Sequence, residues 1–514
     1  MAEFLNGITG WFVADKVVAY LFIALFIWGA TNKFGRKNEF NDDFTSLENM
    51  KSLQGFAALG VILHHISQEP FFQEEGVLSA FVNAGVYFVA IFFFCSGYGL
   101  LKSFDTKKDY LKGFIGKRVV KALVIPFYIN VIIYGILMFI VKWPVEPLQW
   151  VTNFLGITMM NRFAWFPIIL VMLYLVFYLC FRFIKNRPAC FIVIGLFIIS
   201  LGITTSVVGH FAWWYGPDNW WMDDAYYENS FQWWMDQQIF WFNGEWWANS
   251  APAFLTGLLF ANYEKQIVAF FKKKYILKFH ALMVVTILLF MLSEFGQRVY
   301  GYWTEWEGKG PAIDDKIKTY FLQAPLLFVF PVLVFILMMK YHVNNPVSRF
   351  FGKYSLHTYL MNLAAITVCR FIEVPDALVM VGDVKNNLFI YAVTVTILSV
   401  IMGVIEQKIT TKVQDLIYRK PAPVVVDTYV RPSLLDDDKP ATMANVKTEI
   451  MADEKAEAKA EEAKKEPAKR PEEKSEAKAE EKPAEMKAEP EKKAQPKAEN
   501  KPSGKSKKSK KKKG

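Results

Sequence analysis

Apolar and polar residues alternate in long blocks over residues 1 to 420. Several apolar blocks run for about 20 residues almost without charge, which is the length that a helix needs to cross the hydrocarbon core of a bilayer. This pattern predicts an all-α, polytopic membrane bundle of about eleven transmembrane helices embedded in a lipid bilayer. The predicted spans are residues 11–31, 53–67, 77–101, 119–141, 164–184, 189–208, 250–263, 275–295, 319–339, 354–372 and 388–406.

The charge of the loops between these spans predicts the topology. Basic residues gather in alternate loops, and the stretch 102–121 alone holds seven of them, whereas the loop 210–250 holds six acids and no Lys or Arg. Because loops rich in Lys and Arg stay in the cytoplasm, we expect the N-terminus outside and the C-terminus inside. Glu3 and Asp15, instead of a basic segment, stand before and at the start of the first span, so we expect an anchor helix and not a cleaved signal peptide.

Composition divides the chain into three parts. Residues 1–44 form a predicted anchor helix with its cytoplasmic loop, residues 45–420 a membrane domain, and residues 421–514 a disordered cytoplasmic tail rich in Lys, Glu, Ala and Pro. The net charge is +10, and eight lysines fall in the last fourteen residues. The charge therefore does not indicate a nucleic-acid partner. These lysines either attract the anionic inner leaflet or merely solubilise the tail, and we favour the second interpretation.

The cysteines indicate neither a disulfide framework nor a metal site. They lie in or beside apolar stretches and show no Cys-x-x-Cys spacing. We therefore expect buried thiols and no metal. The four residues are Cys95, Cys180, Cys190 and Cys369.

Two adjacent histidines, His64 and His65, stand near the end of the second predicted span. Ionisable groups inside a membrane are costly and mark functional sites by default. On a helix Gln54, Val61 and His65 share one stripe, whereas His64 points about 100° away, so only one imidazole can face a given reacting atom. The alternative is that each imidazole simply binds water, a headgroup or the backbone near the helix end.

A basic segment after the third span offers an anion site. Arg118 and Lys121 stand at i and i+3 on a predicted helix and could grip one anion together, and Lys117 adds a third charge. The location suits the phosphates of a cytosolic cofactor. Ordinary enrichment of basic residues in cytoplasmic loops explains the same cluster.

Several motifs stand in a fixed order along the membrane domain. They are Gln54-Gly-Phe-Ala-Ala-Leu-Gly-Val-Ile-Leu-His-His65, Phe92-Phe-Phe-Cys-Ser-Gly-Tyr98, Lys117-Arg-Val-Val-Lys121 with Pro126, Trp165-Phe166, Phe254-Leu-Thr-Gly257 and Phe351-Gly-Lys-Tyr-Ser-Leu-His-Thr-Tyr-Leu360. Together they resemble the acyltransferase-3 family of integral-membrane O-acyltransferases over roughly residues 45 to 410. The family's ten-helix core would match spans two to eleven and leave the first helix as an addition.

This resemblance implies transfer of an acyl group, commonly acetyl, from cytosolic acyl-CoA to a hydroxyl of an extracytoplasmic glycan. It also implies a location in a bacterial cytoplasmic membrane, and the acceptor is reached directly or through a separate partner protein. The phosphates of CoA would lie near Lys117, Arg118 and Lys121, while the pantetheine arm delivers the thioester to His65. His65 would act as a general base on the acceptor hydroxyl or as a nucleophile that forms an acyl-imidazole.

The chain departs from the family pattern at two positions. Gln54 occupies the position of a basic residue eleven places before the essential histidine, and Lys51, one turn earlier, could supply the missing charge. Asn362 stands where family members often carry histidine, so the sequence assigns it no catalytic role. Ser96 either stabilises an oxyanion or serves close helix packing with the following glycine, and we favour packing.

The outer loop 210–250 contains nine tryptophans among its six acids. Flat aromatic faces suit sugar rings, which makes Trp220 and Trp221 candidates for acceptor binding. An interfacial aromatic belt is the competing interpretation. For the whole chain, the alternatives to an acyltransferase are a transporter or flippase of a polar or glycan substrate, and a scaffold that binds partners through its tail.

Overall fold

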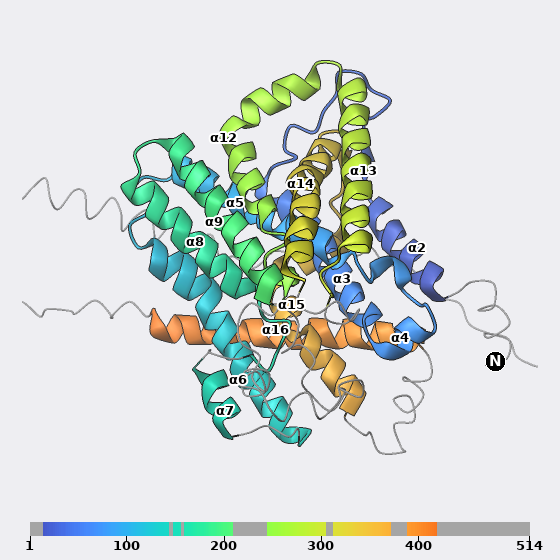
Figure 1. Ribbon diagram of the computed structural model, residues 1–514, viewed down its shortest axis with the longest axis vertical. Helices are drawn as coiled ribbons and strands as arrows, with labels where there is room; N and C mark the ends of the chain where they lie inside the picture. The colour runs from blue at the N-terminus through green and yellow to red at the C-terminus, as the bar shows by residue number, and fades with distance from the viewer. Residues whose placement is uncertain are drawn as a thin grey trace, which may run out of the picture. The chain divides into compact units, whose positions relative to one another are not determined.

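The part of the chain that the structure describes folds almost entirely into helices (Figure 1). The computed structural model describes residues 14–142, 147–155, 159–208, 244–304, 312–371 and 388–418. The predicted tail, residues 421–514, lies outside the described residues. The helices are α2 (Ala14–Ile27), α3 (Leu47–Ser67), α4 (Pro70–Glu74), η1 (Ser79–Phe81), α5 (Gly85–Thr106), η2 (Ile115–Val124), α6 (Ile125–Ile140), α7 (Pro147–Phe154), α8 (Phe166–Phe183), α9 (Arg187–Val208), η4 (Glu245–Trp247), α12 (Pro252–Lys272), α13 (Tyr275–Val299), α14 (Ile313–Met338), α15 (Pro346–Phe371) and α16 (Leu388–Ile417).

A helix overlaps each of the eleven predicted spans, so the all-α fold class is confirmed. Within the described residues, seven helical segments are long and apolar enough to cross a membrane. The strands that the described ranges contain are the two-residue β1 (Thr31–Asn32) and β2 (Tyr341–His342), which pair antiparallel. The four cysteines are buried and unpaired, as predicted. Which end faces the cytoplasm stays a prediction.

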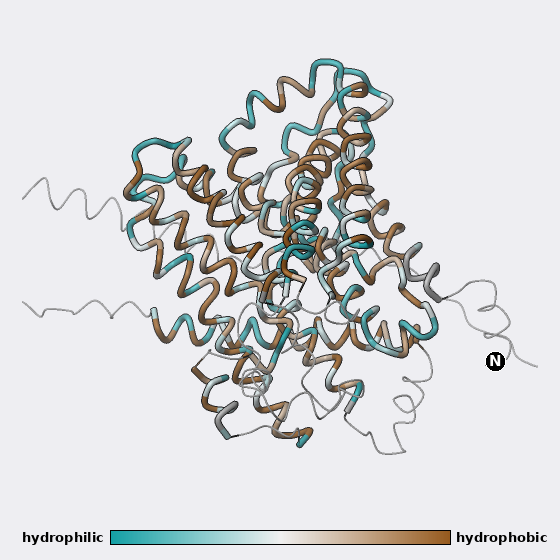
Figure 2. The backbone as a smooth tube through the Cα atoms, viewed as in Figure 1, coloured by the Kyte–Doolittle hydropathy of each residue, from teal (hydrophilic) through white to brown (hydrophobic). Residues whose placement is uncertain are grey.

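The helices α2, α3, α12 and α15 overlap predicted spans but are not among those seven segments. Helix α3 is largely buried and packs against α5, α15 and α16. By contrast, only 17% of the most apolar window of α13 is buried, and many of its large hydrophobic side chains are exposed. Figure 2 shows how many hydrophobic residues follow one another along α13. Because α3 packs against other helices over most of its surface, its polar groups can find partners inside the bundle.

Glycines bring the inner helices into close contact. A β-carbon at Gly55 of α3 would overlap with a carbonyl oxygen of α15, and one at Gly352 of α15 would overlap with a carbonyl oxygen of α3. The same reciprocal contact joins α5 and α12 through Gly97 and Gly257. Small residues allow such approach between membrane helices. The preference for packing in the Ser96-Gly97 pair therefore holds for Gly97.

Helix α3 begins at Leu47, before the predicted residue 53, because the Ser46 side chain caps it by accepting a hydrogen bond from the backbone N–H of Asn49. The added helix α2 packs on α3 and η1, where Phe22 meets the rings of Phe56 and Phe81 edge-on. The helix predicted as an addition therefore lies against the helix that carries both histidines.

A carboxylate links three segments at the end of the bundle where α3 begins and α5 ends. Glu264 follows a kink of α12 at Tyr263. It accepts hydrogen bonds from the hydroxyls of Thr45 and Tyr98 and forms an ion pair with Lys102. This junction holds the segment before α3 against α5 and α12.

Candidate functional site

His65 is buried near the C-terminal end of α3 and meets side chains from two distant parts of the chain. Its Nδ1 lies 2.7 Å from Oδ1 of Asn362 on α15. Its ring stacks on Phe163, with 3.8 Å between the ring centroids and 14° between the planes. Two contacts of different kinds therefore hold the imidazole in one orientation.

The partners of Asn362 determine which imidazole nitrogen carries the proton. Ser399 on α16 donates its hydroxyl hydrogen to the carbonyl of Val395, so its oxygen is left to accept a hydrogen bond from Nδ2 of Asn362 at 3.0 Å. The Asn362 amide then presents its oxygen to His65, and an oxygen can only accept. The proton of neutral His65 is therefore on Nδ1, and Nε2, which makes no hydrogen bond within the described residues, keeps its lone pair.

The segment that carries Phe163 is fastened to α15. The Tyr359 hydroxyl donates a hydrogen bond to the carbonyl of Phe163, and Nδ2 of Asn161 donates to the carbonyl of Leu360 at 2.8 Å. Asn130 of α6 donates to the same carbonyl, also at 2.8 Å. These buried polar groups keep Phe163 on the imidazole.

His64 faces a different environment, as the helical geometry predicts. Its Nδ1 lies 3.0 Å from the carbonyl oxygen of Phe81, and its ring covers Gly85, where a β-carbon would overlap with it. This arrangement packs the start of α5 against α3. The role of His64 in supporting the site stays a prediction.

A cavity of about 150 Å³ adjoins the stripe of α3 that leads to His65. Gln54 and Val61 line it, with Val61 one helical turn before His65. Tyr359 also lines it, and its ring centroid lies 6.3 Å from that of His65. Seven of the eleven lining residues are aliphatic or phenylalanine, and Gln54, Ser96, Ser355 and Tyr359 are polar. The stripe predicted from helical periodicity therefore faces a cavity that is apolar with a few polar groups, as ligand sites commonly are.

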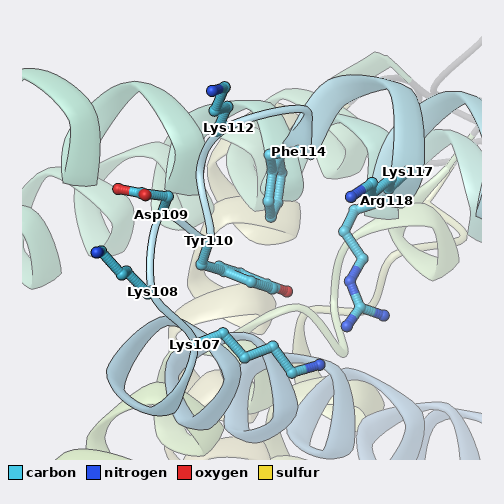
Figure 3. A pocket seen from close by; sticks show the side chains of 8 residues that line it. All are labelled: Lys107, Lys108, Asp109, Tyr110, Lys112, Phe114, Lys117 and Arg118. Atoms are coloured by element: carbon cyan, nitrogen blue, oxygen red, sulfur yellow. The ribbon is translucent and has the colours of Figure 1, made fainter. Parts of the chain in front are cut away.

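A second cavity, of about 340 Å³, lies in the basic segment between α5 and η2 (Figure 3). Lys117 and Arg118 line it, as do Tyr110, Phe114 and Lys107. Gly113, at a φ of +74°, provides the left-handed turn that brings the loop back toward η2. The remaining lining residues are Lys108, Asp109 and Lys112.

The structure separates Lys121 from this group. Residues 115–124 form a π-helix with i→i+5 hydrogen bonds, so residues three apart no longer share a face as they do on an α-helix. Lys121 is absent from the cavity lining, and its ammonium lies over the ring of Tyr418 at the end of α16. The expectation that Arg118 and Lys121 face one anion together is therefore wrong. Lys51 is exposed and lines neither cavity.

One element contributes to both cavities. The π-helix η2 provides Arg118 to the basic cavity and Leu123, five residues later, to the apolar cavity. His65 itself lines neither cavity, but Val61 and Tyr359 line the apolar cavity next to it. Ser96 lines the apolar cavity, and its role stays a prediction.

The tryptophan-rich loop 210–250 is described only at its end. Trp220 and Trp221 lie outside the described residues, and their role in acceptor binding stays a prediction. Trp247 is buried and packs on Trp165, with 6.3 Å between the ring centroids. This tryptophan stabilises the fold and does not offer a free face to a sugar.

Sequence reasoning assigned Asn362 no role and missed a second buried pair, which joins α15 to α16. His357 of α15 and Glu406 of α16 approach to 2.6 Å, and Glu406 is completely buried. Polar residues within predicted spans were a signal for the His65–Asn362 and His357–Glu406 pairs. The two members of each pair lie too far apart in the sequence for the pairing to be inferred.

The helices and the buried imidazole define a multi-pass helical membrane protein with a potential proton acceptor inside its bundle. A family model of the acyltransferase-3 family, described as an acyltransferase domain, matches residues 47–405. The chain belongs to this family and is a membrane acyltransferase, which confirms the resemblance found in the sequence. The match begins at the start of α3 and leaves α2 outside. No curated protein and no solved structure matches the chain significantly.

Proposed function

We propose that the protein transfers an acetyl group from cytosolic acetyl-CoA to a hydroxyl of an extracytoplasmic glycan in the cell envelope, with His65 as general base. The observation that carries this proposal is the hydrogen bond from Nδ1 of His65 to Asn362, because it leaves Nε2 free to accept a proton. Family membership supports acyl transfer over transport.

The charge of the two cavities supports a donor whose phosphates bind at the basic cavity and whose acyl arm lies in the apolar cavity. Lys117 and Arg118 line the first cavity and suit the phosphates of CoA. The apolar cavity, with Gln54 and Ser96 as hydrogen-bonding groups, then accommodates the pantetheine arm, and the thioester lies beyond Val61 beside His65. Gln54 can bind an amide without a charge, so a basic residue at this position is not needed. In this arrangement Lys121 does not contact the donor.

The chemical step moves one proton through His65. Nε2 accepts the hydroxyl proton of the acceptor while the hydroxyl oxygen attacks the thioester carbonyl. When the tetrahedral intermediate collapses, the carbon–sulfur bond breaks, and the thiolate takes the proton from Nε2. The products are the O-acetyl ester and free CoA, and the imidazole returns to its neutral form with its proton on Nδ1.

The first experiment tests this assignment with labelled acetyl-CoA. Membranes that contain the wild-type protein should transfer label to cell-surface polysaccharide, and His65→Ala should abolish the transfer. His280→Ala is the matched control, because His280 is exposed on α13 and, within the described residues, forms a hydrogen bond only with the carbonyl of Ile276. Undiminished transfer by His65→Ala at equal protein abundance would contradict the proposal.

The general-base and nucleophile mechanisms differ in the absence of acceptor. A nucleophilic imidazole would collect label on the wild-type protein before any acceptor is added, and His65→Ala would not. A general base needs both substrates together, so we expect no labelled protein under these conditions. Accumulation of label on the wild-type protein would contradict the general-base mechanism and support one with an acyl-imidazole intermediate.

A further inference from the structure

We propose that Lys107, Tyr110 and Arg118 form a subsite for a phosphate monoester, which is the 3′-phosphate of the CoA donor. This inference rests on the proposed function and adds a specificity for the nucleotide end of the donor. The sequence alone assigned no role to Tyr110 or Lys107, and neither residue belongs to the family motifs. The observations that support the subsite are all at the basic cavity (Figure 3).

Three hydrogen-bond donors converge in this cavity. Figure 3 shows the Tyr110 hydroxyl pointing across the space toward the guanidinium of Arg118, while the Lys107 ammonium approaches the same region from below. The side chains of Lys108 and Asp109 point the other way. The only carboxylate that lines the cavity among the described residues therefore lies apart from the three donors.

The Tyr110 hydroxyl is buried and has no hydrogen-bond partner within the described residues. A buried polar group without a partner is costly, and such groups often indicate a ligand site. The ring cannot turn freely to find another partner, because it packs edge-on against Phe114 at 5.6 Å and lies under the Arg118 guanidinium at 5.7 Å. The fold thus holds a donor directed at a position that an oxygen would fill.

The charge of the cavity selects an anion. Five of its eight lining residues are cationic and one is acidic. In the part of the chain that the structure describes, neither Lys107 nor Arg118 forms an ion pair with a carboxylate. A loop that only determines membrane topology needs positive charge and nothing more. The unpartnered hydroxyl beside these cations therefore indicates a binding site.

The number and directions of the donors favour a monoester over a pyrophosphate. A phosphate monoester presents three strong acceptor oxygens and carries close to two negative charges at neutral pH. Each phosphorus of a pyrophosphate within a chain leaves two free oxygens and continues on both sides. Three donors that approach one point from different directions match the three oxygens of a terminal group. In CoA this group is the 3′-phosphate of the ribose.

The test compares the binding of CoA and 3′-dephospho-CoA to the purified full-length protein in nanodiscs of uncharged lipid. Wild-type protein should bind CoA at least about tenfold more tightly, because charge-assisted hydrogen bonds are the strong ones. Tyr110→Phe and Lys107→Gln should each reduce this preference by about tenfold and leave the affinity for 3′-dephospho-CoA unchanged. Lys273→Gln, an exposed cation outside both cavities, is the control and should keep the preference.

Two results would overturn the subsite: an equal loss of affinity for both coenzymes, which indicates general electrostatic attraction, and no loss in either variant. Failure of the proposed function gives a different pattern, in which wild-type protein binds neither coenzyme. Tyr110-dependent binding of inorganic phosphate, or of nanodiscs with phosphatidic acid, would in that case support a phosphate subsite for a free phosphate or a lipid headgroup and overturn the CoA assignment. Absence of all Tyr110-dependent phosphate binding would overturn both.

Discussion

Replacement of Asn362 tests whether a neutral amide orients the imidazole for catalysis. In Asn362→Leu, a side chain of similar volume removes the acceptor that lies 2.7 Å from Nδ1 of His65. Ser399 loses the amide donor but still donates to the carbonyl of Val395, so the main loss is at His65. The buried Nδ1–H is then without a partner and the other tautomer, with the proton on Nε2, becomes available.

The magnitude follows from the cost of an unsatisfied buried donor, about 1–3 kcal/mol. If this cost appears in the transition state, where the imidazole gains a second proton, kcat should fall by roughly fivefold to 150-fold. The stacking contact with Phe163 remains and limits the loss. The KM for acetyl-CoA should stay the same, because Asn362 does not line the donor cavities.

The assay is initial-rate transfer of labelled acetyl groups in membranes with matched protein abundance. Asn362→Asp keeps an acceptor oxygen for Nδ1–H and should retain more activity than Asn362→Leu, which a purely structural role would not predict. An unchanged kcat in Asn362→Leu would refute the reasoning. A parallel loss in both variants, accompanied by a lower melting temperature, would assign Asn362 to stability alone.

Three further predictions concern the architecture around the site. Gly55→Val should separate α3 from α15, lower the melting temperature and abolish activity, whereas Gly99→Ala, with no atom near the added carbon, should change neither. Glu264→Gln should cost about 1–3 kcal/mol of unfolding free energy in chemical denaturation, because it removes the carboxylate that joins three segments. Glu294→Gln should cost much less unfolding free energy, because the partner of Glu294, Arg298, lies on the same helix and its side chain is 82% exposed. Val61→Phe should fill the apolar cavity and raise the KM for acetyl-CoA several-fold at unchanged stability; an unchanged KM would place the donor elsewhere.

Features that depend on near neighbours in the chain could be predicted from the sequence. Apolar runs located a helix at each predicted span, because the length of hydrocarbon to be crossed sets the length of the run. Helical periodicity placed Gln54 and Val61 on the stripe that leads to His65 and turned His64 away from it, and both appear in the structure. The family motifs in their order then identified an acyltransferase.

Features that depend on packing between distant segments required the tertiary structure. Asn362 lies 297 positions from His65, and no local pattern pairs them or reveals that Ser399 orients the amide. An α-helix over the basic segment would place Arg118 beside Lys121. In the structure the segment is a π-helix, and the two side chains point to different places. Local sequence thus determined where helices form and which residues share a face, since these follow from backbone geometry. Only the tertiary structure decided which faces meet, because contacts between helices depend on how all side chains of the bundle fill space together.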